Sequence, residues 1–317
     1  MAGYLAFRKN IWLPVLLGFL LSISMELTQL FVPGRDTSAI DVLTNLTGSL
    51  FGVGAGVLFE KIAGPRQGPA LQRLTKRKRT DRSALILLFI WAAYLVFPFF
   101  PQVGLYVPIQ KMKVFAQSPL IAAVPFISAI VSWLAAGKLM NAAEIRHARM
   151  FLGLSLLVIP VQFFIVGRQP VPSDLLGALT GLALYIALER NAKSPSWIAA
   201  AFLLTILIRG LAPFHFVQQS SAFNWIPFAG SLNAEWQSGL LVILEKCFYY
   251  GTAIWLLRSS GIRLVFAGAL TAAMLACIEI AQIHLPGRTA ETTDPALAVM
   301  LAFALGVFSR EANRRTG

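Results

Sequence analysis

Charged side chains are scarce in this chain. Only 13% of its 317 residues are charged, whereas 57% are hydrophobic, and the mean hydropathy is +0.69. Ordinary globular domains contain about 25% charged residues, so this scarcity excludes a water-soluble fold. Apolar stretches of about 20 residues recur along the sequence, and each is long enough to cross roughly 30 Å of hydrocarbon as a helix.

Residues that commonly carry covalent or metal chemistry are also few. The two cysteines, Cys247 and Cys277, lie in apolar runs, which excludes a disulfide framework and indicates small buried hydrophobes. The three histidines have no metal-ligand spacing, so neither a metal site nor another cofactor is predicted. No nucleophile with an adjacent base and no glycine-rich phosphate loop is recognisable. A non-enzymatic protein is therefore the leading hypothesis.

Acidic residues are outnumbered, with 14 Asp and Glu against 27 Lys and Arg, which leaves a net charge of +13. The distribution of the cations predicts membrane topology rather than a nucleic-acid partner. With the amino terminus in the cytoplasm, 20 cations lie inside, five outside, and two (Arg209 and Lys246) within spans. Both termini are therefore expected in the cytoplasm. The first apolar run contains Glu26 and ends at a Pro-Gly-Arg turn, which indicates a span rather than a cleaved signal peptide.

The predicted fold is all-α, a polytopic transmembrane bundle of about ten spans. The helices are expected at residues 11–31, 39–60, 83–100, 119–139, 150–166, 174–190, 196–214, 238–257, 262–285 and 294–309. The second and third expected helices are joined by residues 61–82, a segment that contains eight cations together with Gly64 and Pro65. This segment reads as a basic cytoplasmic linker. Its charge either sets topology or attracts anionic lipid, at about 1 kcal/mol per cation.

One short element recurs three times: Gln, four residues, Gly-Arg, five residues, Asp. The copies are Gln29, Gly34, Arg35, Asp41; Gln162, Gly167, Arg168, Asp174; and Gln282, Gly287, Arg288, Asp294. Upstream, Pro98 and Pro213 each precede a Phe at the end of a helix, so the two later copies belong to four-helix units. An even number of spans makes the units parallel. The resulting plan is two plus four plus four helices, and the short first unit reflects either trimming or a missing upstream segment.

The predicted domains follow from this plan. They are a half unit at 1–62, the linker at 63–82, a degenerate unit at 83–192, a full unit at 196–310 and a tail at 311–317.

The first copy also resembles a known family. Glu26, Gln29, a Pro-Gly-Arg turn ending at Arg35, Asp41 and Asn45 together resemble the signature of the VanZ-like family. The third copy keeps Glu279 but has Ala298 in place of Asn45, and the middle copy has Ile159 in place of Glu. The resemblance implies a multi-pass protein of the bacterial cytoplasmic membrane in a cell-envelope context. The founding member is associated with teicoplanin resistance, and the family has no settled biochemical activity.

The element predicts a site at the outer membrane interface. Glu and Gln three residues apart share one helical face, and Arg and Asp follow on the next turn. Arginine offers a planar fork to phosphate or carboxylate, so we expect the set to bind a lipid headgroup, including lipid-linked envelope intermediates. The candidate headgroup-binding residues are Glu26, Gln29, Arg35, Asp41, Asn45, Gln162, Arg168, Asp174, Glu279, Gln282, Arg288 and Asp294.

Other interpretations stay open. The element has a structural alternative, in which Asp294 caps a helix before Pro295, Ser38 with Asp41 forms a capping box, and the arginine pairs with the aspartate across the turn. Two functional alternatives also stand. A membrane enzyme acting on a lipid-linked sugar or phosphate would use Glu279 or Glu26 as acid or base. A transporter would use the candidate intramembrane polar pair Glu245 and Lys246, although Lys246 is also a candidate partner of Glu279.

Overall fold

The computed structural model describes two compact units, formed by residues 1–77 and 78–317. It describes residues 12–29, 45–50, 52–54, 81–98, 100–102, 104–189, 194–218, 222–225, 227 and 236–314. The described secondary structure is helical, with two isolated β-bridges, so the predicted all-α class is confirmed.

In the first unit, helix α2 (Trp12–Gln29) packs against helical residues 45–50 and 52–54. Val15 and Val53 are buried together with Leu46 beside them. The Asn45 side chain donates a hydrogen bond from Nδ2 to Ser22 Oγ at 2.9 Å. Asn45, expected in the headgroup site, therefore joins two helices. The side chains of Glu26 and Gln29, and all of Ser38, Arg35 and Asp41, lie outside the described residues.

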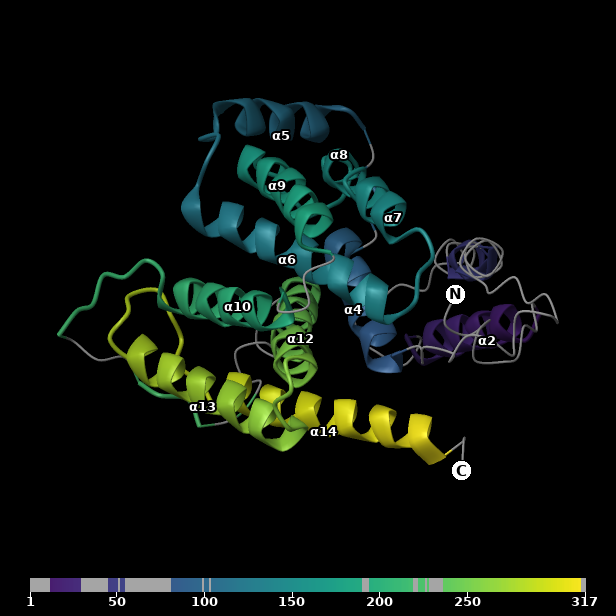
Figure 1. Cartoon of the computed structure of the whole chain (residues 1–317). Helices are drawn as coiled ribbons and strands as arrows, with labels where there is room; N and C mark the ends of the chain where they lie inside the picture. The colour runs from purple at the N-terminus through teal and green to yellow at the C-terminus, as the bar shows by residue number, and fades with distance from the viewer. Residues whose placement is uncertain are drawn as a thin grey trace. The chain divides into compact units, whose positions relative to one another are not determined.

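The second unit consists of two halves that follow one another along the chain. Half A (residues 82–188) contains α4 (Arg82–Val96), α5 (Tyr106–Gln117), α6 (Ala123–Ala142), α7 (Ala148–Ser155), α8 (Val158–Gln162) and α9 (Pro172–Leu188). Half B (residues 194–314) contains α10 (Ser194–Leu211), α12 (Trp236–Ser259), α13 (Leu264–Gln282) and α14 (Thr293–Arg314) (Figure 1).

The helices are apolar enough for a membrane. By length and composition, α6, α13 and residues Ser238–Ser259 of α12 could each cross a bilayer, and six further described helices are apolar but shorter. Large hydrophobic side chains face outward, such as Val265 and Phe303, each 76% exposed. The length and the apolar composition of these helices thus support a membrane protein. The number of ten spans stays a prediction.

Two details of the helix prediction were wrong. The loop after α4 contains an additional helix, α5, which was not expected because its residues are too polar for a span. The expected helix 150–166 is broken into α7 and α8 at Leu156 and Leu157. Pro160 explains the break, because its ring clashes with the carbonyl four residues earlier and it has no N–H to donate.

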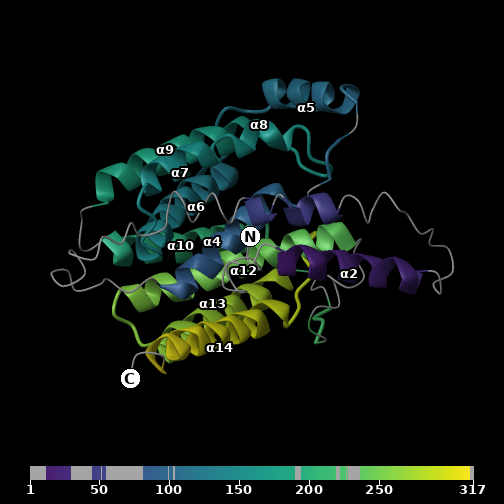
Figure 2. The ribbon, with the colours of Figure 1, turned by 90° about the vertical axis from the view of Figure 1, so that its right-hand side faces the viewer.

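Several helix contacts of half A have a counterpart in half B. Within the halves, α4–α6 corresponds to α10–α12, α6–α9 to α12–α14, and α4–α8 to α10–α13. Between the halves, α4 contacts α12 and α10 contacts α6. The first helix of each half therefore packs against the second helix of the other half. Figure 2 shows α13 and α14 side by side, as in Figure 1. Aromatic side chains fill the central contact, where Trp91 of α4 lies 6.4 Å from Phe248 of α12 between ring centroids.

Candidate functional site

The recurring glutamines close the ends of two helices. Gln162 donates from Nε2 to the Leu95 carbonyl of α4 at 2.8 Å, and Gln282 donates to the Gly210 carbonyl of α10 at 2.9 Å. The last four carbonyls of a helix have no partner within the helix, and both glutamines are only 8% exposed. Each glutamine therefore satisfies a backbone acceptor that has little access to water.

The recurring arginines cap the same helix ends. Arg168 donates from Nε to the Phe97 carbonyl at 2.9 Å and from Nη2 to the Tyr94 carbonyl. Arg288 donates from Nε to the Ala212 carbonyl at 3.0 Å and from Nη2 to the Arg209 carbonyl at 2.9 Å. The expected pairing of arginine with aspartate across the turn was therefore wrong for the second and third copies, the two that the structure describes. Prolines at 98 and 213 end α4 and α10, and the guanidinium fork fits the two carbonyls left there.

The glycines before these arginines supply the turn. Gly167 and Gly287 have φ angles of +70° and +75°, in the left-handed region that side chains with a Cβ adopt at a cost. The turn returns the chain toward the end of α4 or α10, which places the next residue, the arginine, against the exposed carbonyls. The glycine and the arginine thus act together to cap the end of the helix.

The recurring aspartates differ between the halves. Asp174 accepts a hydrogen bond at Oδ2 from the Val171 backbone N–H at 3.3 Å and so caps the start of α9. Asp294 instead lies one residue inside α14, where Tyr250 donates to its Oδ2 at 2.5 Å and Lys246 Nζ lies 2.5 Å from its Oδ1. The expectation of Asp294 as the N-cap residue was therefore wrong, because α14 begins at Thr293.

Glu279 is buried, with 3% of its surface exposed. Its Oε2 accepts a hydrogen bond from the Glu291 backbone N–H at 2.8 Å, which ties α13 to the loop before α14. The half A position holds Ile159, which is likewise buried at 3% exposure.

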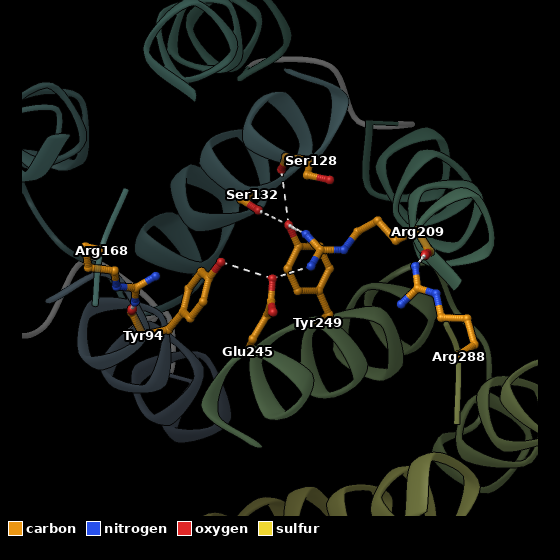
Figure 3. Close-up of polar contacts among 8 residues, drawn as sticks. All are labelled: Tyr94, Ser128, Ser132, Arg168, Arg209, Glu245, Tyr249 and Arg288. Carbon is orange, nitrogen blue, oxygen red and sulfur yellow. Dashed lines mark hydrogen bonds and ion pairs between the residues drawn. The ribbon is translucent and has the colours of Figure 1, made fainter. Parts of the chain in front are cut away.

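The mid-helix pair Glu245 and Lys246 points to two different partners. Glu245 Oε1 accepts hydrogen bonds from Arg209 Nη2 and, at 3.0 Å, from the Tyr94 hydroxyl (Figure 3). Lys246 pairs with Asp294 rather than with Glu279, which had been a candidate partner. Adjacent residues on a helix face different directions, and each therefore reaches a different neighbouring helix.

Sequence reasoning missed the network around Arg209. The sequence analysis placed Arg209 within a span and gave it no partner, but it forms an ion pair with Glu245, and its guanidinium carbon lies 4.6 Å from the Tyr249 ring centroid. The Tyr249 hydroxyl lies 2.9 Å from Ser132 Oγ, so the network extends to α6 (Figure 3). One signal was present in the sequence: Tyr94 and Arg209 each lie four residues before the proline that ends their helix.

These polar groups surround one cavity of about 740 Å³. Nine of the fourteen predicted site residues line it: Gln162, Arg168, Asp174, Glu245, Lys246, Glu279, Gln282, Arg288 and Asp294. The remaining five belong to the first unit, where only Asn45 has a described side chain.

Basic and acidic side chains line the cavity in equal number. Arg168, Arg209, Lys246 and Arg288 are basic, and Asp174, Glu245, Glu279 and Asp294 are acidic. Two of the pairs neutralise each other directly, Arg209 with Glu245 and Lys246 with Asp294. Among the described residues, no group of three or more His, Cys, Asp or Glu side chains has the arrangement of a metal site. The cavity can therefore hold a polar molecule through both donors and acceptors.

Comparison with known proteins identifies one part of the chain. No curated protein and no solved structure matches the chain. The matched segment contains the first copy of the element, including Glu26, Gln29, Arg35, Asp41 and Asn45, and neither of the two later copies. The finding is that residues 1–60 match the model of the VanZ/LLP1 family.

Proposed function

We propose that the cavity of the second unit binds the polar headgroup of a membrane lipid, including lipid-linked glycolipid or glycopeptide intermediates of the cell envelope. The observation that carries this proposal is the position of two separate copies of the element on one cavity of about 740 Å³. Ionisable groups inside an apolar helix bundle are costly unless they face one another or polar contents. A headgroup supplies such contents and leaves its acyl chains in the surrounding lipid.

The chemistry of the lining favours a ligand rich in oxygen atoms. Arg168 and Arg288 use Nε and Nη2 for the helix carbonyls, and among the described residues Nη1 of each makes no hydrogen bond. These groups suit phosphate or carboxylate oxygens. Asp174 and Glu279 suit hydroxyl or amine donors. Because both basic and acidic side chains line the cavity, a ligand that carries both acceptors and donors fits better than a bare anion.

We further propose that halves A and B are parallel VanZ-like repeats, with the cavity facing the extracytoplasmic side. The proposal is supported by the matched bonds of Gln162 with Gln282 and of Arg168 with Arg288, each to the end of the preceding first helix. The orientation rests on the excess of cations in the expected cytoplasmic loops. A bacterial envelope location and a link to antibiotic resistance rest on the family resemblance.

Identification of co-purifying lipids by mass spectrometry tests the headgroup proposal. A Val242→Trp variant places a ring at the cavity lining without removing a capping group, and Leu240→Trp is its control. The two positions lie on α12 and are similarly exposed, at 39% and 40%, but only Val242 lines the cavity. We expect the wild type and Leu240→Trp to retain the same lipid and Val242→Trp to lose it. Equal lipid retention by all three proteins would contradict the proposal.

A second candidate function is an enzyme acting on a lipid-linked sugar or phosphate. The observation that favours it is Glu279, which lines the cavity and has one carboxyl oxygen fixed by a backbone N–H. A carboxyl group held in this way can donate or accept a proton at a bound substrate. Replacing Glu279 by Gln would then abolish turnover and leave lipid retention unchanged, whereas a binding protein would show no turnover in either form.

A further inference from the structure

Helix α5 buries a charged side chain and exposes apolar side chains, the reverse of a helix at an aqueous surface. Lys111 is only 9% exposed, whereas Ile109 and Met112 on the outer side are 48% and 56% exposed. The Lys111 ammonium donates from Nζ to the Ile165 carbonyl at 2.6 Å. Burial lowers the pKa of Lys111 from its ordinary value, because the charged form loses hydration. A helix that buries Lys111 while it exposes Ile109 and Met112 is not built for an aqueous surface.

The outward surface of α5 divides into two flanks. Helical spacing of 3.6 residues per turn places Ile109 and Met112 on one flank with Leu105, the N-cap residue, which is 68% exposed. Lys113 and Gln117 are also exposed and lie on the adjacent flank. The apolar flank thus runs beside a polar flank along the length of the helix.

The inner face of α5 fixes the helix against the rest of half A. Besides the lysine contact, the Phe115 ring meets Phe163 edge to face, with centroids 5.4 Å apart. The Gln169 side chain donates to the Lys111 carbonyl at 3.3 Å. After α5, the Ala122 N–H donates to Ser173 Oγ at the start of α9 at 2.7 Å. The helix is therefore held in one orientation, and its flanks have defined directions.

The place of α5 in the chain puts it at one end of the helix bundle. It connects the end of α4, where Arg168 caps the helix, with the start of α6. Leu120 and Ile121, which follow α5, are 70% and 64% exposed and extend its apolar surface. A membrane-spanning bundle has its bilayer surface at such an end.

We propose that α5 is an interfacial helix that lies in one membrane leaflet beside the end of the bundle that holds Arg168. Its flank of Leu105, Ile109 and Met112 contacts acyl chains, and Lys113 and Gln117 face the lipid headgroups and water. Interfacial helices combine an apolar flank and a polar flank in this way. The inference is independent of what the cavity binds, because no apolar-flank residue of α5 lines it.

Spin labels on the two flanks test this proposal. Cys247 and Cys277 are replaced by Ser, and single cysteines are placed at Ile109, Met112, Lys113 and Gln117 of the full chain. Each labelled protein is reconstituted into vesicles of phosphatidylethanolamine and phosphatidylglycerol. Power saturation then compares the accessibility of each label to oxygen, which concentrates in lipid, and to a water-soluble nickel chelate. All four positions are exposed, so the labels are expected to leave the fold intact, and gel filtration checks this.

We expect the ratio of oxygen to nickel accessibility to be several-fold higher at positions 109 and 112 than at 113 and 117. Equal nickel accessibility at all four positions would mean that α5 lies in water, and would overturn the proposal. Low accessibility to both reagents at 109 and 112 would mean that protein covers the flank, and would overturn it too. Line broadening between labels would then identify a second copy of the chain as the occupant.

Discussion

Halves A and B share a framework and differ in what they present to the cavity. Both use Gln and Arg to close the end of their first helix, with Gly167 or Gly287 making the turn. On the second helix, α6 contributes Ser128, Ala129 and Ser132 to the cavity, and α12 contributes Glu245, Lys246 and Tyr249. Half A has Ile159 where half B has Glu279. The comparison teaches that one part of the element serves folding in both halves, while the ionisable chemistry is concentrated in half B.

The ion pair between Lys246 and Asp294 in half B provides the largest expected effect. Lys246→Met leaves Asp294, whose side chain is 10% exposed, without its cation, and we expect a loss of about 3 kcal/mol of unfolding free energy. Thermal unfolding in detergent micelles measures it. The double variant Lys246→Met, Asp294→Asn removes the isolated charge and should recover most of the loss. A double variant as unstable as the single one would show that the charge is not the cause.

Substitution of the capping arginines should destabilise the protein to different extents in the two halves. Arg168→Ala leaves the Tyr94 and Phe97 carbonyls unsatisfied in a partly buried place, and we expect a loss of about 2 kcal/mol. Arg288→Ala should cost about 1 kcal/mol, because its carbonyls are more exposed and water replaces the guanidinium. Unfolding of both variants under one condition measures the difference. Equal losses would contradict the ranking.

The glutamines should affect the two halves equally. Gln162→Leu and Gln282→Leu each remove one hydrogen bond to a helix-end carbonyl from a residue that is 8% exposed. We expect each to cost about 1 kcal/mol. Gln169→Leu is the control, because its longer 3.3 Å contact with the Lys111 carbonyl should contribute less. A clear difference between the two glutamine variants would mean that the helix ends are not equivalent.

Glu279→Gln should have the smallest effect on stability and the most informative effect on function. The amide oxygen of Gln can still accept the Glu291 N–H, so we expect the unfolding temperature to change little. Lipid retention, measured by mass spectrometry, and any turnover of the retained lipid then separate a binding protein from an enzyme. Ile159→Val, the matched change in half A, should leave both measurements unchanged.

Much of the helical plan was predictable, because apolar runs and the prolines that end helices are local signals. Expected helices at 83–100, 174–190 and 196–214 correspond to α4, α9 and α10 with small shifts at their ends. Helix α5 was not predictable by the same reasoning, because its two lysines and two glutamines conceal an apolar flank that can be recognised only when the buried face is known. The break at Pro160 could have been read from the proline itself.

The candidate site was predictable in part. The regular spacing of the element selected Gln162, Arg168, Asp174 and their counterparts in half B, which line the same cavity. The same spacing suggested an arginine–aspartate pair, which does not form in either described copy. Tyr94 and Tyr249 were missed because a tyrosine in an apolar run carries no sign of the helix it will meet.

By itself, the sequence determined the membrane-compatible composition, the all-α class and the recurrence of one element, since these depend on residue types and on spacing along the chain. Only the tertiary structure decided which atoms the element serves, because the Leu95 and Gly210 carbonyls lie 67 and 72 residues from the glutamines that bind them. It also decided that Arg209 pairs with Glu245 and Lys246 with Asp294. Ion pairs depend on which helices become neighbours, and that choice is made by the packing of whole helix faces.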